Sequence, residues 1–266
     1  MRLPRIYDHF TKGQIFTVDE ARNTLNITGN TLRKRLCELS MRGYIRPVRQ
    51  GLYRLSHPEE NAYPTNTSPY VLASKVTPWS YVGFKSALQF HAHETPAEGE
   101  TIFVVSQRKF NSFEFESREY FWCQSPDTWG LETHAATEGQ WTVNIMVTDF
   151  EKSLLDCLKR PMHSPSLEEI KRLCLLSRKR PNLEKLFRYT CDSQVAAVFN
   201  RIGYFLQIMQ HHWDISNEAL TPFQQNMSRR QTEWNLPDTV VSQGAAEERW
   251  RIQFGKNTLD NAIADC

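Results

Sequence analysis

Basic side chains cluster between residues 29 and 55, and their chemistry suits a polyanion such as nucleic acid. The cations of this stretch are Arg33, Lys34, Arg35, Arg42, Arg46, Arg49 and Arg54, against the single acid Glu38. Residues 1–56 hold eleven Lys and Arg and four acids, a net charge of +7, which leaves −5 for the rest of the chain. This asymmetry favours a nucleic-acid partner for the N-terminal part.

Hydroxyl and amide side chains precede these cations. Thr28, Asn30 and Thr31 come just before Arg33 and Lys34, and such groups bond phosphate oxygens near the start of a helix. Two other interpretations stay open. A short run of cations is usually the solvated face of a helix, and helix-turn-helix modules can also bind protein.

Elsewhere the sequence offers few groups arranged for catalysis. His91 and His93 in HAHE could suggest a metal site, but residues two apart do not share a helical face, and we expect a surface loop. The acids of VTDFEK at 147–152 fit a helix N-terminus better than a nuclease centre. The six cysteines show no metal-ligand spacing, and GxGxxG, P-loop, GxSxG and HExxH motifs are missing. We therefore expect no enzyme, no metal and no cofactor.

The elements that must position the basic residues follow from local patterns. FTVDEARNTL predicts a helix with a capping box, Thr17 with Glu20. The next predicted helix, TLRKRLCELSM at 31–41, buries three leucines on one face, which leaves Asn30, Arg33, Lys34 and Cys37 on the other. Gly43 would end it. YIRPV and LYRL then predict a hairpin around RQG. The order helix, helix, hairpin is that of a winged helix-turn-helix.

This order predicts a DNA-binding surface. The second helix would enter the major groove, while the hairpin would lie along the backbone or in a minor groove. The residues expected to contact DNA are Thr28, Asn30, Thr31, Arg33, Lys34, Arg46, Arg49 and Arg54.

The pattern of the remaining residues predicts a second domain that contains both helices and strands. We therefore expect the fold class α+β. We expect a winged helix-turn-helix at 1–57, a linker at 58–69 and a mixed α/β C-terminal domain at 70–266 with a helical second half. TIFVVS, FEFES, REYFWCQ and WTVNIMV predict strands, and ERWRIQFG predicts a last strand that returns to the sheet. In VTDFEKSLLDCL, Thr148 and Glu151 have capping-box spacing. The aromatic residues at 110–122 alternate as a strand core would, and a partner surface is the alternative interpretation.

Several of these motifs resemble one known family. FTVDEA, LRKRL and GYIRPVRQGLYRL resemble the winged helix of AbiEi-type antitoxins, which belong to type IV toxin–antitoxin systems of bacterial abortive infection. YVGFKSALQFHAHE, VTDFEKSLLDCLKRP and ERWRIQFG are similar to motifs of the same family, although Ser153 replaces a threonine. The resemblance implies a repressor that binds repeats near its own promoter, where it could oligomerise. It also implies a nucleotidyltransferase-like toxin that is counteracted without a stable complex.

Alternatives from other classes stay open. They are a winged-helix regulator of a mobile element or defence locus without a toxin, a DNA-processing enzyme, and a protein–protein adaptor. The chain has neither a signal-peptide pattern at its start nor a run of about 18 apolar residues, so we expect a cytoplasmic protein without a membrane partner.

Overall fold

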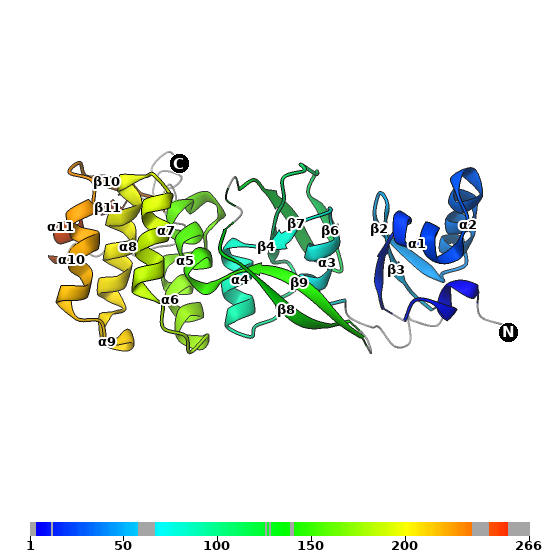
Figure 1. Cartoon of the computed structure of the whole chain (residues 1–266), viewed down its shortest axis with the longest axis horizontal. Coiled ribbons are helices and arrows are strands. Elements are labelled where there is room, and N and C mark those ends of the chain that lie inside the picture. The colour runs from blue at the N-terminus through cyan, green and yellow to red at the C-terminus, as the bar shows by residue number, and fades with distance from the viewer. Residues whose placement is uncertain are drawn as a thin grey trace, which may run out of the picture. The chain divides into compact units, whose positions relative to one another are not determined.

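The computed structural model describes residues 4–11, 13–57, 67–125, 127, 129–138, 141–235 and 245–254. The fold is mixed α+β, as predicted (Figure 1). The chain forms two compact units: unit 1 is Met1–Val82 with Pro96–Val147, and unit 2 is Gly83–Thr95 with Thr148–Cys266. Residues 58–66 of the predicted linker lie outside the described residues. The predicted domain boundaries stay a prediction.

The N-terminal region, residues 4–57, contains the predicted helix, helix and hairpin. Its elements are the 3₁₀ helix η1 (Arg5–Asp8), β1 (Ile15–Thr17), α1 (Val18–Leu25), α2 (Gly29–Met41), β2 (Ile45–Arg49) and β3 (Leu52–Leu55). The strands form an antiparallel sheet in the order β1-β3-β2, so that Pro47 lies on an edge strand, where its missing N–H costs no ladder bond. Strand β1 was not predicted, because three residues carry almost no periodic signal.

Local signals explain how the two helices begin and end. Thr17 accepts a hydrogen bond from Glu20 N, and the Glu20 carboxylate accepts one from Thr17 N, which confirms the predicted capping box of α1. Leu32, Leu36 and Leu39 of α2 are buried in a core that includes Ile6, Phe10, Phe16, Ala21 and Ile45. Gly43 follows α2 with a φ of +73°, a conformation in which glycine carries no Cβ penalty.

Unit 1 also contains a larger sheet, called the second sheet below. After α3 (Pro69–Lys75), its strands are β4 (Tyr81–Val82), β5 (Thr101–Val105), β6 (Phe113–Phe115), β7 (Arg118–Cys123), β8 (Leu131–Glu138) and β9 (Trp141–Thr148). Their order is β6-β7-β5-β4-β9-β8, with β5–β7 and β4–β9 parallel. The strands predicted at 101–123 and 141–147 are confirmed. Figure 1 shows β8 and β9 as a long two-stranded ribbon.

Unit 2 is mainly helical. Its elements are α4 (Phe84–His91), α5 (Phe150–Lys159), η3 (Pro161–His163), α6 (Leu167–Leu176), α7 (Leu183–Asp192), α8 (Ala196–Ile208), α9 (Gln210–Trp213), α10 (Asn217–Asn226), β10 (Thr232–Trp234), α11 (Ala245–Trp250) and β11 (Ile252–Phe254). Helix α4 packs on α5 and α6.

Two sequence predictions for unit 2 were wrong in detail. In ERWRIQFG, residues up to Trp250 are helical, and β11 pairs in parallel with β10 instead of returning to the second sheet. The N-cap of α5 is Asp149, whose carboxylate accepts from Lys152 N, so Thr148 and Glu151 form no capping box. Asp149 is itself a strong N-cap residue, and the helix therefore begins one residue later than expected.

The end of the described chain is held against α8. The Trp250 ring lies over Gly203, where an added Cβ would stand 2.0 Å from the ring. Asn200 Nδ2 donates to Trp250 O over 2.8 Å, and Trp250 Nε1 donates to Gln207 Oε1 over 2.6 Å. A glycine is therefore required at position 203 for this ring to pack.

Candidate nucleic-acid interface

Helix α2 and its N-cap residue contain five of the eight residues predicted to contact DNA. Thr28, Asn30, Thr31, Arg33 and Lys34 are all exposed. Asn30, Arg33 and Lys34 project away from the side of α2 that carries the buried leucines, since residues three and four apart share a helical face. Thr28 is the N-cap residue, and Thr31 lies at the border of the buried side. Within the described part of the chain, neither Arg33 nor Lys34 forms an ion pair. Their charges therefore face solvent on a helix whose opposite side is fixed in the core.

The N-terminus of α2 has unused hydrogen-bonding capacity. Thr28 is the N-cap residue, with extended backbone at φ −129°, but its side chain makes no capping hydrogen bond. The first amides of a helix have no intrahelical acceptor and favour an anion. Thr28, Asn30 and Thr31 thus lie beside backbone N–H groups that can donate hydrogen bonds to a phosphate oxygen.

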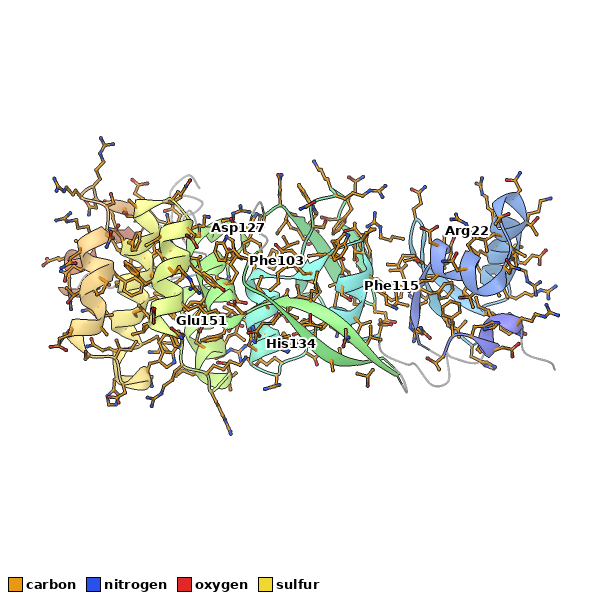
Figure 2. The ribbon with its side chains drawn as sticks, viewed as in Figure 1. Arg22, Phe103, Phe115, Asp127, His134 and Glu151 are labelled. Atoms are coloured by element: carbon orange, nitrogen blue, oxygen red, sulfur yellow. The ribbon has the colours of Figure 1, made fainter. Side chains whose placement is uncertain are left out.

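The hairpin arginines have partners inside the protein. Arg46 is exposed, and its Cζ lies 5.1 Å from the centre of the Phe115 ring. The Arg49 Cζ lies 5.0 Å from the Phe110 ring and 5.4 Å from the Phe113 ring. These distances fit cation–π contacts. Phe115 belongs to β6 of the second sheet, and its side chain is labelled in Figure 2.

Arg49 has more contacts with the rest of the protein than Arg46 has. Its Nη1 donates to the Val76 carbonyl over 3.2 Å, and the side chain is half-buried beside the two-residue turn of the hairpin. Burial lowers the pKa of Arg49, and the nearby positive charge of Arg108 lowers it further. The side chain stays charged, since the ordinary pKa of arginine is far above neutrality.

Arg54, the third predicted hairpin contact, lies inside the protein. Its exposed fraction is 2%, and its Nε stands 3.6 Å from Glu116 Oε1. The same carboxylate accepts from Thr67 N over 3.0 Å and from Thr67 Oγ1 over 3.2 Å. A guanidinium in this position does not face an external phosphate. The sequence held a signal for this: Arg54 shares its strand face with Leu52, two residues away, and Leu52 is buried.

The aromatic partners of these arginines come from the segment predicted as strand core. Phe110, Phe115 and Tyr120 are buried, and Phe113 stacks on Tyr120 with ring centres 5.0 Å apart. Their contact with arginines more than 60 residues earlier in the chain was not predicted, because a single sequence does not show which distant segments meet. Another contact between the N-terminal region and a later segment joins β1 to α3: Lys75 Nζ donates to Ile15 O over 2.6 Å.

The two histidines considered as metal ligands lie in different surroundings, and the expected surface loop is wrong for His91, which belongs to helix α4. His91 is buried at the end of α4, and its Nε2 lies 2.8 Å from Thr148 O. A carbonyl only accepts, so Nε2 carries the proton and Nδ1 accepts from Lys179 Nζ at 3.0 Å. His93 is exposed and adopts a φ of +56°. Among the described residues, no group of three or more His, Cys, Asp or Glu is arranged to hold a metal ion.

The acids at the start of α5 stabilise unit 2. Lys185 Nζ lies 3.1 Å from Asp149 Oδ2 and 3.0 Å from Glu151 Oε2, and Figure 2 labels Glu151. Tyr189 donates to Asp149, and burial, with Asp149, raises the pKa of Tyr189 to about 12. The expected pair of Lys152 with Asp156 is present at 2.5 Å. The carboxylates of Asp149 and Glu151 thus connect the start of α5 with Lys185 and Tyr189 of α7.

Comparisons with known proteins identify no relative: no family model, no curated protein and no solved structure matches the chain. In the residues for which coordinates are described, no helix combines the length and the apolar character needed to cross a membrane.

Proposed function

We propose that the N-terminal region is a winged helix that binds double-stranded DNA, and that the protein is a transcriptional repressor. Helix α2 would lie in the major groove with Arg33 and Lys34 toward base edges. Thr28, Asn30 and Thr31 would bond the phosphates beside the helix N-terminus.

The observation that carries this proposal is the exposure of Arg33 and Lys34 on α2, where neither forms an ion pair with a described residue. Arg33 and Lys34 project from a helix anchored by Leu32, Leu36 and Leu39. A packed helix that presents exposed cations is suited to direct readout in a major groove. A helix that binds protein usually presents an apolar surface, and Met41, exposed at 84%, is the one large hydrophobic side chain exposed on α2.

In the proposed complex, the hairpin has a smaller share of the DNA contact. Arg46 keeps its exposed position, and Arg49 is half-buried, so both can approach a phosphate only with the part of the guanidinium that the aromatic rings leave free. Arg54 is left out of the proposed DNA surface because it is buried next to Glu116.

The resemblance to AbiEi-type antitoxins extends the proposal to a regulatory circuit. We propose that the repressor acts on its own operon and that the rest of the chain serves an antitoxin role against a nucleotidyltransferase-like toxin. This proposal is supported by the short motifs that resemble the family, FTVDEA, LRKRL, GYIRPVRQGLYRL and VTDFEKSLLDCLKRP among them. A neighbouring gene for such a toxin, and rescue of cells that express it when this protein is supplied, would test the antitoxin role. Growth arrest that persists with the protein present would contradict it.

Binding to DNA is tested by a gel-shift titration of the whole protein on its own upstream DNA and on a scrambled fragment, at 50 and 200 mM salt. We expect preference for the upstream fragment and an affinity that falls steeply with salt, as counterion release predicts. Equal, salt-independent binding to both fragments, or none to either, would overturn the proposal. Cleavage of the fragment in the presence of a divalent cation would instead indicate an enzyme.

A further inference from the structure

A cavity of about 320 Å³ opens in the N-terminal region between η1, the end of α1 and α2. Its apolar wall consists of Ile6, Leu25, Ile27 and Leu39. Ile6 and Leu39 are buried, whereas Leu25 and Ile27 are only half-buried and leave apolar surface facing the cavity. The volume lies at the lower end of the range typical of small-molecule sites.

Two guanidinium groups line the same cavity. Arg5 is exposed and forms no ion pair with any described residue. Arg35 is paired with Glu38 at 3.1 Å, but the two side chains are 44% and 55% exposed. A pair so exposed contributes little to stability, so Arg35 can change partner at low cost. The cavity thus combines an apolar wall with cations at its rim.

We propose that this cavity binds a small organic anion with an apolar body, such as a carboxylate on a short alkyl chain or a single ring. The apolar body would cover Leu25 and Ile27, and the carboxylate would meet the planar donor forks of Arg5 and Arg35. The two arginines disfavour a cationic ligand. A neutral alcohol of the same length would fill the space but leave the guanidinium groups without a charged partner.

The position of the cavity connects this ligand to α2. Thr31 and Arg35 line the cavity from α2, and Ile27 lines it from the turn before that helix. Thr31 also belongs to the proposed DNA surface. A carboxylate beside Thr31 would place negative charge next to a phosphate, so the ligand weakens DNA binding. This second effect rests on the proposed function, while binding of the anion does not.

The ligand site is tested with hexanoate on the full chain, by following methyl NMR signals of Ile6, Leu25 and Ile27. We expect saturable shifts with hexanoate, and binding of hexanol and hexylamine that is at least fivefold weaker. The double variant Arg5→Gln/Arg35→Gln should bind hexanoate at least fivefold more weakly. Arg42→Gln, an exposed change at the C-cap of the same helix, should bind it as the natural protein does. No saturable shift, or equal binding of the three probes, would overturn the proposed site.

The coupling is tested by repeating the gel shift with hexanoate at constant ionic strength, with chloride as the control salt. We expect about a fivefold loss of DNA affinity, which reciprocal linkage requires to equal the loss of hexanoate affinity on DNA binding. If the protein binds no DNA even without hexanoate, the proposed function fails while the methyl NMR result stands. If it binds DNA but hexanoate changes neither the methyl signals nor the DNA affinity, the cavity proposal fails alone.

Discussion

The arginines of α2 and those of the β2–β3 hairpin belong to the same short basic segment, but they have different surroundings. Arg33, like Lys34 beside it, faces solvent without an ion pair in the described structure. Arg46 and Arg49 lie over phenylalanine rings, and Arg54 is buried near Glu116. The same residue type thus provides a free charge in one element and a structural contact in the other. Local charge density alone does not separate the two roles, because burial and partners decide them.

The largest expected effect concerns stability and the buried arginine. Arg54→Ala removes a buried guanidinium that stands 3.6 Å from the half-buried Glu116 carboxylate, and it leaves a void in its place, so we expect the free energy of unfolding to fall by about 3 kcal/mol. Urea denaturation measures it. The matched control is Arg22→Ala, which breaks an exposed pair with Asp19 and should cost less than about 1 kcal/mol. Equal losses in the two variants would mean that burial does not make Arg54 more important for stability than Arg22.

Next in size is the loss of DNA affinity from the free face. Arg33→Ala or Lys34→Ala should weaken binding to the preferred site by about 1–3 kcal/mol and relax its sequence preference, with unchanged stability. Titrations on specific and random DNA measure both effects. Equal losses on the two DNAs would show that these side chains bind phosphates and read no bases.

A smaller effect is expected where Arg49 meets its aromatic partners. A double-mutant cycle of Arg49→Ala with Phe110→Leu should give a coupling energy of about 0.5–1 kcal/mol in the free protein. The same Arg49→Ala variant should lower the salt slope of DNA binding by at most about one unit, as for a single phosphate contact. A coupling energy of zero, together with a salt slope lowered by a full unit, would mean that Arg49 behaves like the solvent-facing Arg33 and is not held by the aromatic rings.

The smallest effect is expected at Arg46, which is exposed and has one ring partner. Arg46→Gln should change the free energy of unfolding by about 0.5 kcal/mol or less. Thermal denaturation of Arg46→Gln and of Arg54→Ala, measured side by side, compares the stability loss at two positions of one hairpin. A loss as large as that of Arg54→Ala would mean that exposure does not rank these arginines.

Much of the N-terminal region could be predicted because its signals are local. A capping box, three leucines at helical spacing and a glycine at a positive φ each act within a few residues. Strand β8 was missed because LETHAATE is polar and carries little strand propensity, and its place depends on pairing with β9.

The candidate site was predictable on the helix and only partly on the hairpin. The exposure of Arg33 follows from the period of α2. The burial of Arg54 follows from strand alternation, but that rule competes with the expectation that charged residues face water. The contacts of Arg49 with Phe110 and Phe113 depend on tertiary packing, which no local pattern encodes.

The way the chain divides between its two units has a genetic consequence. It passes from one unit to the other at three points, after Val82, Thr95 and Val147. A recombination event between the codons of Val147 and Thr148 would therefore not transfer unit 2 whole: α5 and α6 would leave without α4, and Thr148 O would lose the hydrogen bond from His91. Unit 2 cannot be inherited as one contiguous cassette, and its exchange between genes requires two separate stretches of DNA.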